Sequence, residues 1–132
     1  MTKEKLYFIG NSENNSFRLD VYYTEPFIRP ERIINQIRIS DKDDIVAMKI
    51  DIISRGGRKK DFWDLHELFS EYSIKQMINL HKERFPYSHS GEEIISGLRN
   101  FDIADSEFDP VCLLGKHWEV IKLDFMDALE GV

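Results

Sequence analysis

Two charged residues, Lys49 and Asp61, fall on the expected apolar sides of adjacent helices. The spacing of apolar residues predicts one helix over residues 43–54 and another over residues 60–72. On a helical wheel, Lys49 lies near the centre of the first apolar arc, away from the polar side where Ala47 and Asp51 lie, and Asp61 lies within the second arc. A buried charge is costly unless it is paired or used in chemistry. These residues therefore form either an ion pair that joins the helices or part of a reactive site.

The loop between these helices is basic, and its cations are Arg55, Arg58, Lys59 and Lys60. It leads into the predicted N-terminus of the second helix, where free N–H groups and the helix dipole favour an anion. Two interpretations stay open. One is a solvated turn made flexible by Gly56 and Gly57, and the other is a phosphate-binding loop.

Asp20 is a further candidate, because a carboxylate in the middle of a predicted strand either binds a metal or simply faces solvent. Phosphoryl chemistry with Mg²⁺ needs several convergent carboxylates. The histidines do not have the spacing of a metal-binding motif. The sequence also contains no P-loop, no G-x-G-x-x-G motif and no G-x-S-x-G motif.

The composition predicts one folded domain, since 42% of the 132 residues are hydrophobic. A net charge of -6 argues against broad electrostatic binding to nucleic acid. Any contact with RNA should therefore be confined to the basic loop. The single cysteine, Cys112, excludes an intrachain disulfide and favours a reducing compartment. No apolar run approaches the length of a membrane span, and we expect a cytoplasmic protein without a membrane partner.

The order of the predicted elements indicates an α+β fold in a single domain. Residues 1–40 should form a small antiparallel sheet, made of a β-hairpin (6–9 and 17–23) and a short strand at 36–39. Residues 41–132 should form a block of four to five helices, at 43–54, 60–72, 73–85, 91–101 and 116–129. Such a thin sheet exposes an edge that favours pairing with a second copy or with a complementary protein chain.

The segment AMKIDIISRGGRKKDFWDL resembles the signature of the AbiEii/AbiGii-type, MenT-like nucleotidyltransferase toxins, which belong to toxin–antitoxin systems. The strand at 17–23 and the helix that follows it also match the order seen in this family. The resemblance implies that Mg²⁺ and a nucleoside triphosphate are cofactors. It places Lys49 against the triphosphate, Asp61 near the reacting phosphate as the second catalytic residue, and Arg55 at a phosphate. By the same resemblance Asp20 is a strand carboxylate near the metal, and Asp64 is structural.

The sequence departs from this family in its metal-binding motif, a glycine-serine turn and helix followed by a DxD strand. Gly10, Ser12 and Asp20 do not have its spacing. We therefore expect a truncated nucleotidyltransferase-like protein that keeps the Lys/Asp phosphate-side motif and is inactive by itself. The alternative is a non-catalytic interaction module, either a homodimer or a subunit that completes a split nucleotidyltransferase.

Overall fold

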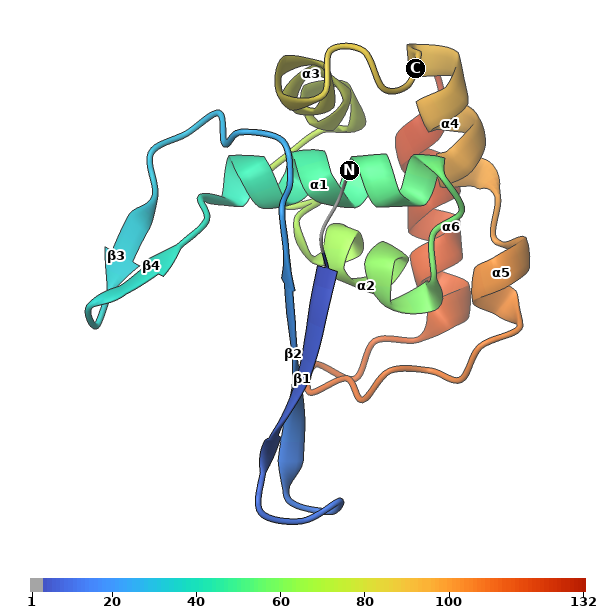
Figure 1. The fold of residues 1–132 in the computed structure, drawn as a ribbon. Helices are drawn as coiled ribbons and strands as arrows, with labels where there is room; N and C mark the ends of the chain where they lie inside the picture. Colours follow the sequence, from blue (N-terminus) through green and yellow to red (C-terminus); the bar gives the residue numbers. More distant parts are fainter. Residues whose placement is uncertain (1–3) are drawn as a thin grey trace.

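Two β-hairpins precede a block of helices in the computed structural model, which describes residues 4–132 (Figure 1). The first hairpin pairs β1 (Glu4–Gly10) with β2 (Ser16–Tyr22), and the second pairs β3 (Arg32–Ile34) with β4 (Ile37–Ile39). The helices are α1 (Lys42–Ser54), α2 (Lys59–Glu67), α3 (Ile74–Arg84), α4 (Gly91–Arg99), the single turn α5 (Asp102–Asp105) and α6 (Trp118–Leu129). The α+β arrangement expected from the sequence is confirmed.

The short strand expected at residues 36–39 is present as β4, but it does not join the first sheet. Instead it folds back on β3, with Ile34 opposite Ile37. The two residues between them, Asn35 and Gln36, have φ angles of 50° and 65°. Positive φ at both central positions is typical of the two-residue turn that closes a tight hairpin. Local turn geometry therefore produces a second, separate hairpin.

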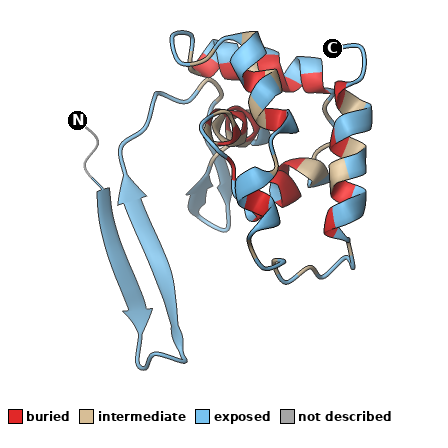
Figure 2. Ribbon diagram, turned by 90° about the vertical axis from the view of Figure 1, so that its right-hand side faces the viewer, coloured by how far each residue is buried: buried red, intermediate tan, exposed pale blue. Residues whose placement is uncertain are grey.

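The core lies entirely within the helical block, and the residues of all four strands are exposed (Figure 2). Helix α1 runs through the middle of the block and packs against α2, α3 and α4. Phe62 anchors the centre through edge-to-face contacts with Phe101 and Phe125, each with ring centroids 5.2 Å apart. Fully buried aliphatic side chains surround these rings, namely Val46, Ile50, Ile53, Leu65, Ile94, Leu98, Ile121 and Leu129.

Hydrogen bonds from side chains set several helix ends at positions that the sequence indicates. Asp41 caps α1 by accepting a hydrogen bond from the N–H of Asp43. Ser73 and Gln76 form a reciprocal capping box at the start of α3. Helix α2 ends at Glu67 instead of residue 72, because the N–H groups of Leu68 and Phe69 donate to carbonyl oxygens three residues back and not four. The intervening residues tighten into turns that aim the chain into α3.

One expectation about α1 is wrong. The helical wheel places Ala47 and Asp51 on the polar side, away from the arc that contains Lys49. In the structure both residues are buried. The reason is that α3 and α4 cover this side of α1, so the helix is enclosed over more of its circumference than an amphipathic surface helix is.

The crossing of α1 and α4 depends on Gly97. A Cβ atom at this position would lie 2.8 Å from the carbonyl oxygen of Ile53 and 2.9 Å from Cα of Ser54. Gly97→Ala should therefore push the helices apart and lower the free energy of unfolding by about 1–3 kcal/mol, measured by urea denaturation. Gly91→Ala is the control, because the nearest atom to its Cβ is Lys82 Nζ at 4.0 Å. Equal stability of the Gly97→Ala variant and the wild type would contradict this packing.

Candidate functional site

Lys49 and Asp61 meet between α1 and α2, as the helical wheel predicts. Lys49 Nζ donates to Asp61 Oδ1 at 3.1 Å and lies 2.9 Å from Asp64 Oδ2. The Lys49 side chain is 15% exposed and that of Asp61 5%, whereas that of Asp64 is 60% exposed. Burial alone lowers the pKa of Lys49, but the hydrogen bonds and charges of Asp64 and Asp61 raise it above its ordinary value. Lys49 is thus a charged group with one buried partner and one accessible partner.

Asp61 has a second role at the start of α2. Its Oδ2 atom accepts a hydrogen bond from the backbone N–H of Arg58 at 3.0 Å. The next N–H group, that of Lys59, donates to Glu107 Oε1 at 2.9 Å. The N-terminus of α2 therefore already holds two carboxylates, which are the kind of anion that the helix dipole favours there.

The cations of the basic loop are largely paired within the chain. Arg55 lies 3.2 Å from Asp51 Oδ2, and Arg58 lies 2.7 Å from Glu107 Oε2. Lys59 is buried, and its Nζ contacts the Glu107 carbonyl oxygen and the Asp109 carboxylate. Arg55 and Arg58 remain mostly exposed, as does Lys60. A phosphate group could reach these three residues, although it would have to replace carboxylates on the two arginines.

Asp20 lies on the face of the first hairpin that is turned toward the helices. We call this the inner face, and it carries Arg18, Asp20 and Tyr22 from β2 with Leu6 and Phe8 from β1. The Tyr22 hydroxyl lies 3.7 Å from Met48 Sδ in α1. Arg18 of the inner face also lies close enough to Arg58, just before α2, to affect its pKa. Glu107 raises the pKa of Arg58, and the charge of Arg18 opposes this rise. The inner face therefore looks onto α1 and the start of α2.

The residues around Asp20 do not by themselves fit Mg²⁺. Asp20 Oδ1 accepts a hydrogen bond from Arg18 Nε at 2.9 Å, so a cation already occupies this carboxylate. Within residues 4–132, no group of three or more His, Cys, Asp or Glu side chains is arranged to hold a metal ion. A magnesium ion needs more oxygen ligands than this face supplies.

A polar cluster around Asp51 was missed by the sequence reasoning. Asp51 Oδ1 accepts hydrogen bonds from the Ser88 hydroxyl at 2.7 Å and from His81 Nε2 at 3.0 Å, and His89 Nε2 lies 3.5 Å away. Burial raises the pKa of Asp51, but these hydrogen bonds and the charge of Arg55 lower it below its ordinary value. The cluster is not a nucleophilic triad, because Ser88 donates to the carboxylate and not to an imidazole.

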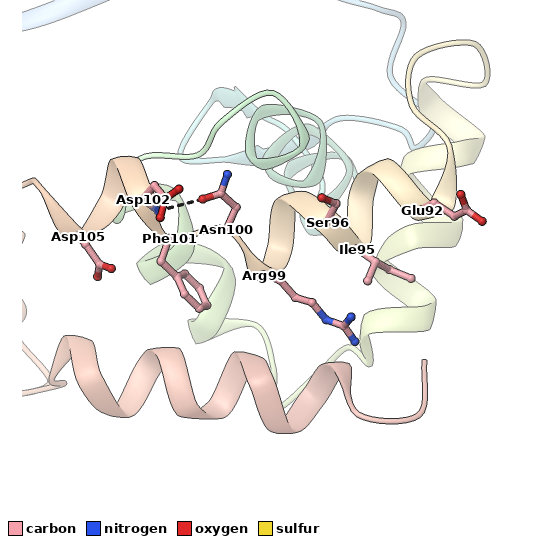
Figure 3. Close-up of a pocket in the computed structure, with 8 residues that line it drawn as sticks. All are labelled: Glu92, Ile95, Ser96, Arg99, Asn100, Phe101, Asp102 and Asp105. Carbon is pink, nitrogen blue, oxygen red and sulfur yellow. Dashed lines mark hydrogen bonds between the residues drawn. The ribbon is translucent and has the colours of Figure 1, made fainter.

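One open cleft borders these residues, and another lies apart from them. One of about 800 Å³ lies where the end of the first hairpin meets α1 and the loop after α3, and Arg55, Asp51 and Ser88 are on its wall. The other, of about 630 Å³, runs along α4 and α5 (Figure 3). Its polar side chains spread apart, and its lining includes neither Lys49 nor Asp61. The first cleft is lined by Arg55 but likewise by neither Lys49 nor Asp61. Arg55 and Lys59 also line two further open clefts, one along α4 and one beside the start of α6.

Comparison of the chain with models of protein families, with curated protein sequences and with solved structures finds no match. The resemblance to AbiEii/AbiGii-type nucleotidyltransferases therefore stays a prediction that rests on the residues quoted above. In the part of the chain that the structure describes, no helix is both long enough and apolar enough to cross a membrane.

Asp51 should link the stability of the protein to pH. Its pKa is lowered in the folded state, so its stabilising effect is present above the unfolded-state pKa of about 3.9 and is lost as the pH falls through the folded-state pKa. We expect Asp51→Asn to lower the free energy of unfolding at pH 7 by about 1–3 kcal/mol. The difference from the wild type should shrink below about pH 4 in denaturation experiments. Exposed Asp127→Asn is the control, and a deficit in Asp51→Asn that does not change with pH would contradict this role.

Proposed function

We propose that this chain supplies the phosphate-side half of a nucleotidyltransferase-like site of the AbiEii/AbiGii type. It would bind the triphosphate of a nucleotide weakly, through Lys49 and the basic loop. The acidic residues that hold Mg²⁺ in such enzymes would come from a complementary polypeptide segment outside these 132 residues. The observation that supports this most is the position of Lys49, between a buried carboxylate and an accessible one.

The two carboxylates that contact Lys49 differ in how easily a ligand could displace them. Asp61 is fixed by the N–H of Arg58 and is almost fully buried. Asp64 is mostly exposed and contacts Lys49 from the solvent side. Asp64 is the solvent-exposed member of this pair, so a phosphate oxygen can take its place on Lys49 by exchanging one anion for another. In this proposal Asp64 occupies the phosphate position on Lys49 when no ligand is bound.

The exposed arginines extend this position toward the hairpin. The charge of Arg18 on the inner face opposes the rise in the pKa of Arg58, and Arg55 borders the cleft at the end of β2. A triphosphate has enough charge to contact several of these cations through charge-assisted hydrogen bonds. Because the arginines must leave their carboxylates, we expect a dissociation constant no tighter than roughly the high micromolar range. Binding should weaken as salt is added.

Titration with ATP, followed by backbone amide NMR, tests this function. Wild-type chemical shifts should move at Lys49 and along the loop from Arg55 to Lys60. Asp64→Asn should tighten ATP binding about two- to fivefold, because it removes the carboxylate that competes for Lys49. Asp127→Asn removes the same charge from an exposed site on α6 and should leave the affinity within a factor of two. The absence of any shift at millimolar ATP would contradict the proposal, and so would equal affinities of the two variants.

A further inference from the structure

The first hairpin turns its most apolar side away from the helices. The register of β1 and β2 places Tyr7 opposite Leu19 and Ile9 opposite Phe17, with Val21 next along the same side. We call this side the outer face. Its five apolar residues are each 41–62% exposed. The charged pair formed by Arg18 and Asp20 lies instead on the inner face.

An ordinary antiparallel sheet packs one apolar face on the core. Here both faces of the hairpin are exposed, and the inner face, which carries Leu6 and Phe8 beside the charged pair, is the more polar of the two. An isolated two-stranded hairpin is also only marginally stable, so that it needs packing against another surface. The inner face makes limited contact with the helices, such as that from Tyr22 to Met48. Figure 2 shows the hairpin standing beside the helical block, with all of its residues exposed. An apolar patch of this kind marks a surface that binds another molecule.

We infer that the outer face binds the outer face of a second copy of this chain. The two hairpins would stack face to face as the layers of a small β-sandwich, about 10 Å apart. A two-fold axis between them places Leu19 of each copy against apolar side chains of the other, so both surfaces are already present in the chain.

Charge favours this surface over the rest of the molecule. The chain has a net charge of -6, so two copies repel each other across most orientations. The outer face is uncharged except for Lys5 at its end, and stacking it on itself brings no carboxylates together. The outer face therefore combines exposed apolar side chains with an absence of carboxylates.

The area of the outer face suits a weak, specific dimer. Five side chains of this size, each about half exposed, would bury about 500 Å² per copy. The total of about 1,000 Å² is at the lower limit for specific protein interfaces. The inner face and the Lys49 site remain open in this arrangement. The dimer therefore does not depend on the proposed nucleotide site, and either proposal can fail without the other.

Analytical ultracentrifugation of the full chain tests the dimer, with Leu19→Lys and Leu6→Lys as matched variants. The two leucines lie on opposite strands and opposite faces, with exposed fractions of 41% and 48%. The wild type should form a reversible dimer at tens to hundreds of micromolar. Leu19→Lys should weaken association at least tenfold, because it buries two lysines in the interface. Leu6→Lys, which is opposite Asp20 on the inner face, should change it less than threefold.

Amide NMR spectra of the helical block would serve as the control that each variant is folded. In a mixed sample of labelled and unlabelled chains, intermolecular NOEs between Leu19 methyl groups and the Tyr7 ring would support the face-to-face arrangement. A wild type that stays monomeric at several hundred micromolar would overturn the proposal, and a different polypeptide would then be the occupant of the outer face. Equal weakening by the two variants, or a Leu19→Lys protein that still dimerises, would also overturn it.

Discussion

The ion pair of Lys49 and Asp61 is the constraint on which the helical block depends. Because α1 is enclosed by α2, α3 and α4, a lysine directed toward α2 needs a carboxylate within reach. Asp61 meets this need with one oxygen, and with the other it accepts a hydrogen bond from the N–H of Arg58, the residue just before α2. One carboxylate therefore fixes both the start of α2 and its distance from α1. The close approach at Gly57, where a Cβ atom would lie 2.8 Å from Cγ1 of Ile53, completes this corner.

The parts of the fold that depend on local sequence could be predicted, and those that depend on distant contacts could not. Ser73 and Asp41 satisfy backbone groups within their own turn, so their helix starts follow from residue type. The contact between Lys49 and Asp61 could also be predicted, because two opposite charges on facing apolar arcs stabilise each other. The burial of Asp51 was not, since its partners Ser88 and His81 come from later segments with no recognisable spacing. The separate β3–β4 hairpin depended on positive φ angles at Asn35 and Gln36, which are less common in such residues than in glycine.

The candidate site shows how internal pairing limits what a cluster of cations can bind. The sequence shows a concentration of positive charge between Arg55 and Lys60, but it does not show the carboxylates that neutralise it. Glu107 and Asp109, which are distant in sequence, form ion pairs with Arg58 and Lys59, respectively. What remains for a ligand is the exposed side of this network, where Asp64 is the partner most readily displaced. An anionic ligand would therefore bind here mainly by replacing carboxylates on the cations, because most of these positive charges are already paired.

A double-mutant cycle between Lys49 and Asp61 tests the central claim most directly. Unfolding free energies would be measured by urea denaturation for the wild type, Lys49→Met, Asp61→Asn and the double variant. If the pair fixes the corner of α1 and α2, Asp61→Asn should be the more harmful single change, because it leaves a largely buried cation with only its exposed partner. The coupling energy should be about 2 kcal/mol or more. A coupling energy below about 0.5 kcal/mol, within the range of additive changes at independent sites, would contradict the account.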